Sequence, residues 1–188
     1  ASLTGIGICI GAFRERSAAA LRMNAGAYGG EMKQIVESAG VLTSEGEVLN
    51  LTNEELGMGY RTSVIAKNDY VALSAVLKLE KGDRQEIRAY MEDLKERRVT
   101  KQPLEFGSAG STFKRPEGYF AGKLIQDSGM QGYRVGDAQV SEKHCGFVIN
   151  RGNATAAEVM QLMKDVADRV EEKFGVRLEP EVRRIGEF

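Results

Sequence analysis

The sequence is poor in the side chains that bind metals or form disulfides. It has one histidine and two cysteines, Cys9 and Cys145, which lie far apart in the chain. Structural and catalytic metal sites need a cluster of such ligands, so no metal site is predicted. Two cysteines in a chain of 188 residues make no disulfide framework, and a reducing cytoplasm is the expected compartment.

Long apolar runs and an excess of charge are also missing. No apolar stretch approaches the roughly 18–20 residues needed to cross a bilayer, so we expect no membrane insertion. The net charge is −1, whereas a nucleic-acid-binding surface is clearly basic, so we expect no nucleic-acid partner. The first residues carry no basic region before an apolar core, and no signal peptide is predicted there. The sequence leaves the oligomeric state open.

The first half of the chain is predicted to form strands and turns with one helix. Apolar residues on both sides of 44–47 predict a hairpin within 37–51. The segment 70–79 is rich in Val, Leu and Ala, which is typical of a largely buried strand. Asp83, followed three residues later by Glu86, predicts the capping box of a helix. The helix should end at 96–98 and bury a stripe formed by Ile87, Tyr90, Met91 and Leu94.

The second half should begin after a domain boundary near 99–104, because a helix does not continue through Pro103. A short helix is expected to point Phe120, Leu124 and Ile125 inward and to end at Gly129. Residues 139–149 are predicted to form one strand. Thr155 and Glu158 form a second capping box, which opens a strongly amphipathic helix that ends at Gly175.

The segment 108–116 is the main candidate for a binding site. Its small residues allow a ligand to approach the backbone, Ser111 can donate or accept a proton, and Lys114 and Arg115 suit a phosphate or carboxylate. A turn serine is the ordinary alternative for Ser111. A serine hydrolase is disfavoured because the single histidine, His144, lies in no recognisable triad context.

Arginine and glutamate residues outside this segment are candidates of the same kind. Arg61 offers a planar fork for a carboxylate, although a solvated arginine at the end of a strand is the default alternative. Glu179 and Glu181 flank Pro180, and a charged tail is the default alternative for them. The glycine-rich segment 23–31 lacks dinucleotide-fingerprint spacing, but its small residues would let the backbone approach a flat cofactor ring.

Ordered motifs over nearly the whole chain resemble the compact class of the UDP-N-acetylenolpyruvoylglucosamine reductase family, flavoenzymes of bacterial cell-wall peptidoglycan synthesis. The motifs are MNAGAYG at 23–29, YRTS at 60–63, GSTFKRP at 110–116, AGKLI at 121–125, VSEKH at 140–144, NATA at 153–156 and LEPEV at 178–182. The resemblance implies an α+β fold with two domains. Residues 1–98 would be the second half of an FAD-binding module, with a partial sheet, and residues 99–188 a smaller substrate-binding domain whose tail returns to the active site.

The resemblance also implies the reaction and the residues that carry it. Reduced FAD, itself reduced by NADPH, would deliver hydride to the enolpyruvyl double bond of a UDP-sugar substrate in the bacterial cytoplasm. Arg61 would hold the substrate carboxylate, Glu181 would stabilise the enolic intermediate, and Ser111 would give the proton to carbon. The remaining residues implied are Asn24, Ala25, Gly26 and Tyr28 for the cofactor, and Lys101, Lys114, Arg115 and His144 for the substrate.

Two departures from the family keep alternatives open. The first flavin-binding domain, with its phosphate loop, has no counterpart in this sequence. Residues 7–19 do not resemble the flavin-contacting segment of the family, and either a shifted reading frame or a genuine divergence accounts for them. The main alternative function is a non-enzymatic module that keeps the substrate domain and binds a nucleotide sugar without flavin.

Overall fold

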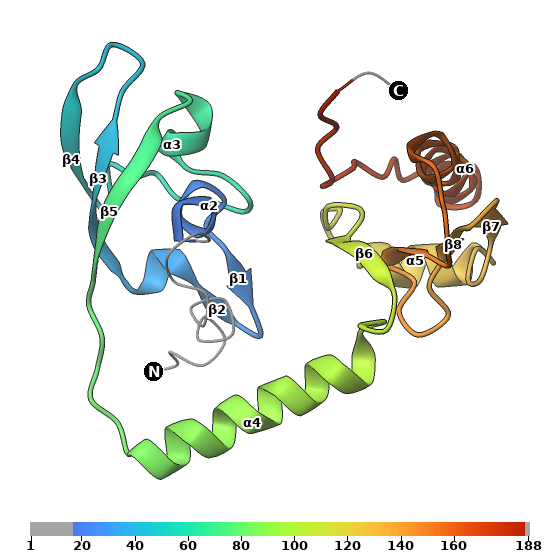
Figure 1. Ribbon diagram of the computed structural model, residues 1–188, viewed down its shortest axis with the longest axis horizontal. Helices are drawn as coiled ribbons and strands as arrows, with labels where there is room; N and C mark the ends of the chain where they lie inside the picture. The colour runs from blue at the N-terminus through green and yellow to red at the C-terminus, as the bar shows by residue number, and fades with distance from the viewer. Residues whose placement is uncertain (1–16, 187–188) are drawn as a thin grey trace. The chain divides into compact units, whose positions relative to one another are not determined.

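The computed structural model describes residues 17–186, and the chain divides into two compact units, 1–97 and 98–188 (Figure 1). Each unit has its own sheet and its own buried apolar cluster, and the predicted α+β fold is confirmed. Most of 7–19, where the sequence departs from the family, lies outside the described residues. Within the described part of the chain, no helix is long and apolar enough to cross a membrane.

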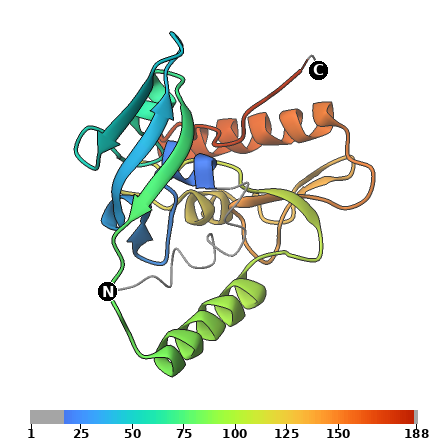
Figure 2. The same cartoon turned by 60° about the vertical axis from the view of Figure 1, so that its left-hand side comes forward.

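The first unit is built on a three-stranded antiparallel sheet in which β3 lies between β4 and β5 (Figure 2). Its core gathers apolar side chains from the sheet, the short helices and the loops, including Leu21, Val41, Leu56 and Ile65. The elements are α2 (Ser17–Arg22), β1 (Gly26–Ala27), β2 (Gly30–Glu31), the 3-10 helix η1 (Met32–Gln34), β3 (Val36–Leu42), β4 (Val48–Thr52), α3 (Val64–Lys67) and β5 (Val71–Leu77).

The hairpin predicted within 37–51 is confirmed by β3 and β4. The turn between them is closed by Thr43, which accepts the backbone N–H of Glu47 on its Oγ1 at 3.2 Å and donates its own N–H to the Glu47 carbonyl at 2.8 Å. The prediction of one helix was wrong, because α2 and α3 are too short to show a helical period in the sequence.

The predicted strand at 70–79 is present as β5, but the prediction that it is largely buried was wrong. Val71, Leu73 and Val76 are 56%, 54% and 53% exposed. The strand lies at one edge of the described sheet, and only Ala72 and Leu77 of its apolar residues pack on the core. Composition predicts a strand here correctly, but it does not show which faces of that strand are covered.

The helix α4 (Arg84–Lys101) crosses the division between the units. Asp83 caps its start by accepting the backbone N–H groups of Gln85 and Glu86 at 2.8 and 3.0 Å. The predicted end at 96–98 was wrong by three residues, because Pro103 restricts only the residue before it. Of the predicted stripe only Leu94 is buried; Ile87 is partly buried, while Tyr90 and Met91 are exposed.

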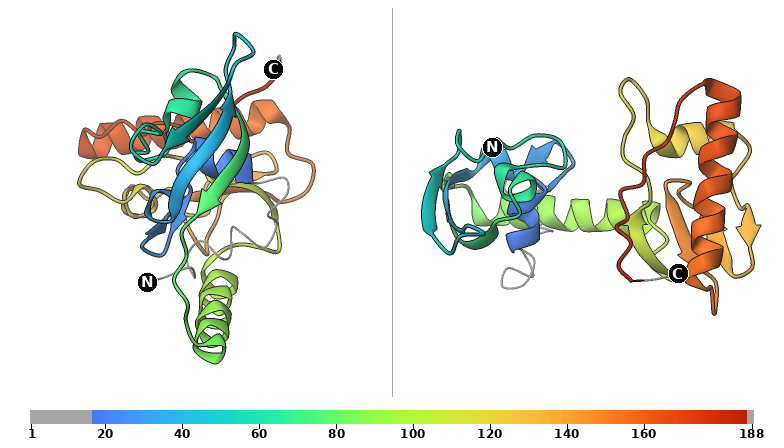
Figure 3. Two further views of the ribbon diagram at one scale, coloured as in Figure 1. Left: turned by 90° about the vertical axis from the view of Figure 1, so that its left-hand side faces the viewer. Right: turned by 90° about the horizontal axis from the view of Figure 1, so that it is seen from above.

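The second unit is a four-stranded antiparallel sheet in the order β6-β9-β8-β7, with two helices packed on its core (Figure 3). Val140 and Val148 from the sheet meet Ile125 and Leu162 from the helices in that core. The elements are β6 (Gly107–Ser111), α5 (Ala121–Asp127), β7 (Arg134–Val135), β8 (Ala138–Val140), β9 (Phe147–Asn150) and α6 (Ala156–Phe174).

Two expectations for this unit were wrong. The single strand predicted over 139–149 is two strands, β8 and β9, joined by a turn at 141–146. Phe120, expected to point inward from α5, is the residue before that helix and is 62% exposed. Leu124 and Ile125 are buried as predicted.

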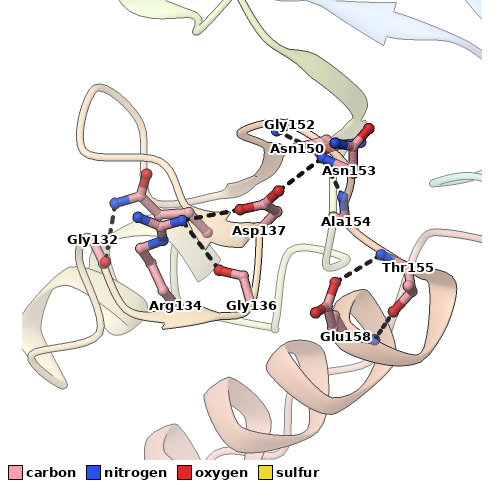
Figure 4. Close-up of polar contacts among 11 residues, drawn as sticks. Gly132, Arg134, Gly136, Asp137, Asn150, Gly152, Asn153, Ala154, Thr155 and Glu158 are labelled. Carbon is pink, nitrogen blue, oxygen red and sulfur yellow. Dashed lines mark hydrogen bonds and ion pairs between the residues drawn. The ribbon is translucent and has the colours of Figure 1, made fainter.

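The start of α6 is held by polar contacts drawn in Figure 4. Thr155 and Glu158 form the predicted capping box. The Glu158 carboxylate accepts the Thr155 N–H at 2.8 Å, and Thr155 Oγ1 accepts the Glu158 N–H at 3.2 Å. Asp137, in the turn between β7 and β8, accepts the Asn153 N–H at 2.8 Å. The hairpin and the loop before α6 are therefore tied to one another.

Candidate functional site

The serine segment lies where β6 ends. Ser111 is the last residue of β6 and is exposed, whereas the next two residues, Thr112 and Phe113, are buried. A bulge precedes Ser111: Ser108 pairs with Ile149 and Ser111 pairs with Phe147. Three steps along β6 therefore match two along β9, and Ser111 stands at the edge of an irregular, solvent-facing strand end.

The C-terminal tail pairs with the residues that follow Ser111. Glu181 donates its N–H to the Thr112 carbonyl at 2.9 Å, and Lys114 donates its N–H to the Glu179 carbonyl at 2.8 Å. Phe113 and Pro180 form an antiparallel bridge between these two bonds. The backbone of the tail is therefore paired at 179–181, and Glu181 lies opposite the residue next to Ser111.

Two cations extend this site. Lys114 Nζ lies 3.0 Å from Glu179 Oε2, so a phosphate bound by Lys114 would compete with a carboxylate. The Arg115 guanidinium carbon lies 4.0 Å from the centre of the Phe120 ring, and its Nε donates to the Tyr119 carbonyl at 3.2 Å. The contact with the Phe120 ring and the bond to Tyr119 both act on the Arg115 guanidinium group, the kind of group that binds phosphates and carboxylates.

His144 lies in the turn between β8 and β9. Its Nδ1 accepts the Gly146 N–H at 3.1 Å, which makes Nε2 the protonated atom of the neutral ring, and its ring meets Phe147 edge-on. The His144 side chain is exposed, so its Nε2–H can donate to a ligand. Lys143, next to it, donates to the Val99 carbonyl at 2.9 Å and so ties this turn to the last turn of α4.

Lys101, expected to contact a substrate diphosphate, is the last residue of α4. The C-terminal end of a helix carries partial negative charge, which a cation offsets and a phosphate does not. Lys101 therefore has a structural reason for its position that is independent of any ligand.

Arg61 belongs to the first unit, so its place beside Ser111 and Glu181 stays a prediction. It lies in a tight turn closed by bonds between Gly59 and Thr62, and its backbone φ is 55°, a left-handed conformation that is costly for a residue with a side chain. Ser63, the last residue of the same motif, is buried and donates to the Arg22 carbonyl at 2.8 Å. The motif thus joins a strained arginine to a structural serine.

The residues expected to bind FAD are engaged with their own chain. Asn24 is buried; its Nδ2 donates to Glu31 Oε2 and to the Gly59 carbonyl, and its Oδ1 accepts the Lys33 N–H. A Cβ at Gly26 would lie 2.9 Å from Glu31 Cγ, so the space left by this glycine is already filled.

The backbone of Ala25 bonds in the same way, to Ala20 and Met32. Tyr28, with φ 53°, is exposed. These contacts make a well-bonded hairpin among the described residues, and FAD binding by this hairpin stays a prediction.

Neither metal binding nor thiol chemistry gains support in the second unit. Within residues 17–186, no three histidine, cysteine, aspartate or glutamate side chains gather as metal ligands do. Cys145 is buried, and burial raises the pKa of its thiol above the ordinary value.

Sequence reasoning missed the supports of the serine segment. It singled out Ser111 but not Ser108 or Thr112, whose hydroxyls bond the β9 backbone. The sequence does place three hydroxyl side chains and a glycine within 108–112. A simple turn does not require so many hydroxyl groups, and this density could have indicated that some of them bond the backbone.

Comparison with known proteins identifies the second unit. Residues 102–185 match the C-terminal domain of UDP-N-acetylenolpyruvoylglucosamine reductase. The match begins directly after α4 and includes both the serine segment and the tail paired with it. This chain contains the C-terminal domain of the UDP-N-acetylenolpyruvoylglucosamine reductase family.

Whole-chain comparisons agree. Proteins named UDP-N-acetylenolpyruvoylglucosamine reductase from Agathobacter rectalis and Lachnoclostridium phytofermentans are 59% and 61% identical over 169 and 168 residues, or 90% and 89% of this chain. The chain covers 54% of each of them, so it spans about half the length of these relatives. The crystal structure of the Thermus caldophilus UDP-N-acetylenolpyruvylglucosamine reductase matches 97% of the chain, with a TM-score of 0.78 at 33% identity, and the match covers 64% of that protein.

Proposed function

We propose that this chain supplies the substrate-binding and proton-donating part of the reduction of UDP-N-acetylenolpyruvoylglucosamine to UDP-N-acetylmuramate in peptidoglycan synthesis. The pairing of the tail with residues 112–114 carries the proposal, because it places Glu181 opposite the neighbour of Ser111. A proton donor and a carboxyl group carried by two paired segments suit a reaction in which negative charge develops on a carbon and its carboxylate.

Each residue has a role that its surroundings allow. Ser111 is exposed and donates a proton to the substrate carbon, and Glu181 stabilises the enolic intermediate. Arg61 holds the substrate carboxylate, with its planar fork matching the two oxygens. Lys114 and Arg115 bind the diphosphate, and His144 donates from Nε2 to the substrate.

FAD and NADPH are the cofactors that the family resemblance implies. The Asn24 side chain is hydrogen-bonded within its own chain, and Glu31 occupies the space beside Gly26. The proposal therefore assigns the described residues to substrate binding and proton donation and gives them no part in the flavin chemistry. The second candidate function is a nucleotide-sugar-binding module that works without flavin.

Two measurements test the proposal. Titration calorimetry with UDP-N-acetylglucosamine should detect binding, and Arg115→Ala should weaken it by about tenfold, the loss expected for one charge-assisted hydrogen bond. Arg169→Ala, which removes an ion-paired arginine from the exposed side of α6, is the charge-matched control. No binding, or equal effects of both variants, would refute the site. A bound-flavin absorption spectrum in the purified protein separates the reductase from the flavin-free module.

A further inference from the structure

The bulge before Ser111 leaves a gap in the ladder between β6 and β9. One extra residue of β6 is accommodated between Ser108 and Ser111, and Gly110 takes a φ of 89°, which glycine adopts without strain. Across the gap lies Val148, a buried residue of β9. Its backbone N–H and carbonyl need partners, because an unpaired buried backbone group is costly.

Side-chain hydroxyls supply both partners. Ser108 Oγ donates to the Val148 carbonyl at 2.9 Å, and Thr112 Oγ1 accepts the Val148 N–H at 3.0 Å. Ser108 Oγ also accepts the Gly110 N–H at 3.2 Å, within the bulge itself. Two hydroxyls on either side of Ser111 therefore replace the backbone bonds that a regular ladder would make.

Thr112 joins further segments through its backbone. Its N–H donates to the Gly146 carbonyl at 2.9 Å, and its carbonyl accepts the Glu181 N–H at 2.9 Å. One buried residue thus contacts β9, the turn before β9 and the tail. A shift of Thr112 would move Ser111, its neighbour, and Glu181, its partner, together.

The three hydroxyls of this segment differ in their use. Those of Ser108 and Thr112 are bonded to the backbone, whereas the Ser111 hydroxyl has no hydrogen bond to the part of the chain that the structure describes. We propose that Ser108 and Thr112 are positioning residues, whose hydroxyls fix the bulge so that Ser111 and Glu181 keep one geometry. That these two hydroxyls matter for catalysis rests on the function proposed above. That they fix the bulge does not depend on it.

Amide hydrogen exchange on this chain tests the proposal without any ligand. Thr112→Val keeps the shape but removes the acceptor, so the Val148 and Glu181 amides should exchange about tenfold faster or more, beyond the change shared by the whole unit. Thr112→Ser keeps an oxygen acceptor and should restore both rates. If Thr112→Val fails to fold, Ser108→Ala tests the other end of the bulge, and the Gly110 amide, which Ser108 Oγ accepts, should exchange faster.

The matched control is Ser128→Ala, which removes a buried hydroxyl that donates to the Ile125 carbonyl at 2.8 Å at the end of α5. It should change the exchange of its own surroundings and leave the Glu181 amide unaffected. If Ser128→Ala and the bulge variants accelerate the same amides by the same factor, the two hydroxyls are ordinary buried groups and the proposal is wrong. Binding of UDP-N-acetylglucosamine to the unmodified chain is measured separately, so its loss would refute the proposed function alone.

Discussion

Gly136 lies against the carboxylate of Glu158, so closely that a Cβ at position 136 would overlap it. That carboxylate accepts the Thr155 N–H and so caps α6. Gly136 also has a φ of 56°. The turn between β7 and β8 and the start of α6 therefore depend on one another through a residue without a side chain.

Gly136→Ala should destabilise the second unit by more than the left-handed conformation alone accounts for. That conformation costs about 1–2 kcal/mol for alanine, and the displaced Glu158 should lose a cap of about 0.5–2 kcal/mol. Gly118→Ala is the matched control, since its φ is 75° and nothing lies within 4 Å of the added Cβ. Urea denaturation of both variants compares them, and equal losses would contradict the contact with Glu158.

Ser111→Ala should slow protonation of the substrate carbon and little else. Loss of a general acid typically costs about 10²–10⁴-fold. In a preparation loaded with FAD, stopped-flow measurement should show flavin reduction by NADPH nearly unchanged and reoxidation by the enolpyruvyl substrate slowed. Equal slowing of both half-reactions would indicate a structural role for Ser111.

Arg61→Lys keeps the charge but loses the two-pronged grip on a carboxylate. If Arg61 binds more tightly as charge builds on the substrate, turnover should fall while the Michaelis constant changes little. A raised Michaelis constant with normal turnover would assign Arg61 to ground-state binding alone. Normal values of both would remove it from the site.

The sequence was most informative where a local pattern determines a local structure. The hairpin of β3 and β4 and the capping box at Thr155 were predicted because turn chemistry and caps act over a few residues. The exposure of Val71 and the split of 139–149 were not, because they depend on which surfaces meet after folding. The backbone hydrogen bond between Glu181 and Thr112 was not predicted either, because the two residues lie far apart in the sequence.

Asp168 should make stability sensitive to acid. Hydrogen bonds from Lys164 and then Arg177 lower its pKa below the ordinary value of 3.8. Its contribution to stability is therefore present above that value, and it is lost as the pH falls from there through the folded-state pKa. Asp168→Asn should lower the urea midpoint at neutral pH and have little effect well below pH 3.8.

The matched control for that measurement is Asp127→Asn, which removes a carboxylate paired with Lys123 on α5. Salt should weaken both effects, because both carboxylates lie at the surface. A loss for Asp168→Asn that stays constant from neutral to acid pH would contradict the predicted dependence.

Cys145 should react slowly with iodoacetamide in the folded chain. Its thiol is buried, and burial raises its pKa, so little thiolate is present or accessible near neutral pH. A Cys9→Ser variant confines the label to Cys145, and mass spectrometry follows its rate. Labelling should accelerate greatly in urea, and equal rates with and without urea would contradict the buried position.

The pairing of the tail with residues 112–114 also sets an order of assembly during synthesis. Residues 178–182 leave the ribosome after β6, both helices of the second unit and the rest of its sheet. Those elements can collapse on their shared core while the tail is still being made. Leu178 of the tail belongs to that same core and is added last, so a nascent chain that stalls after α6 lacks part of its core as well as the pairing of Glu181 with Thr112.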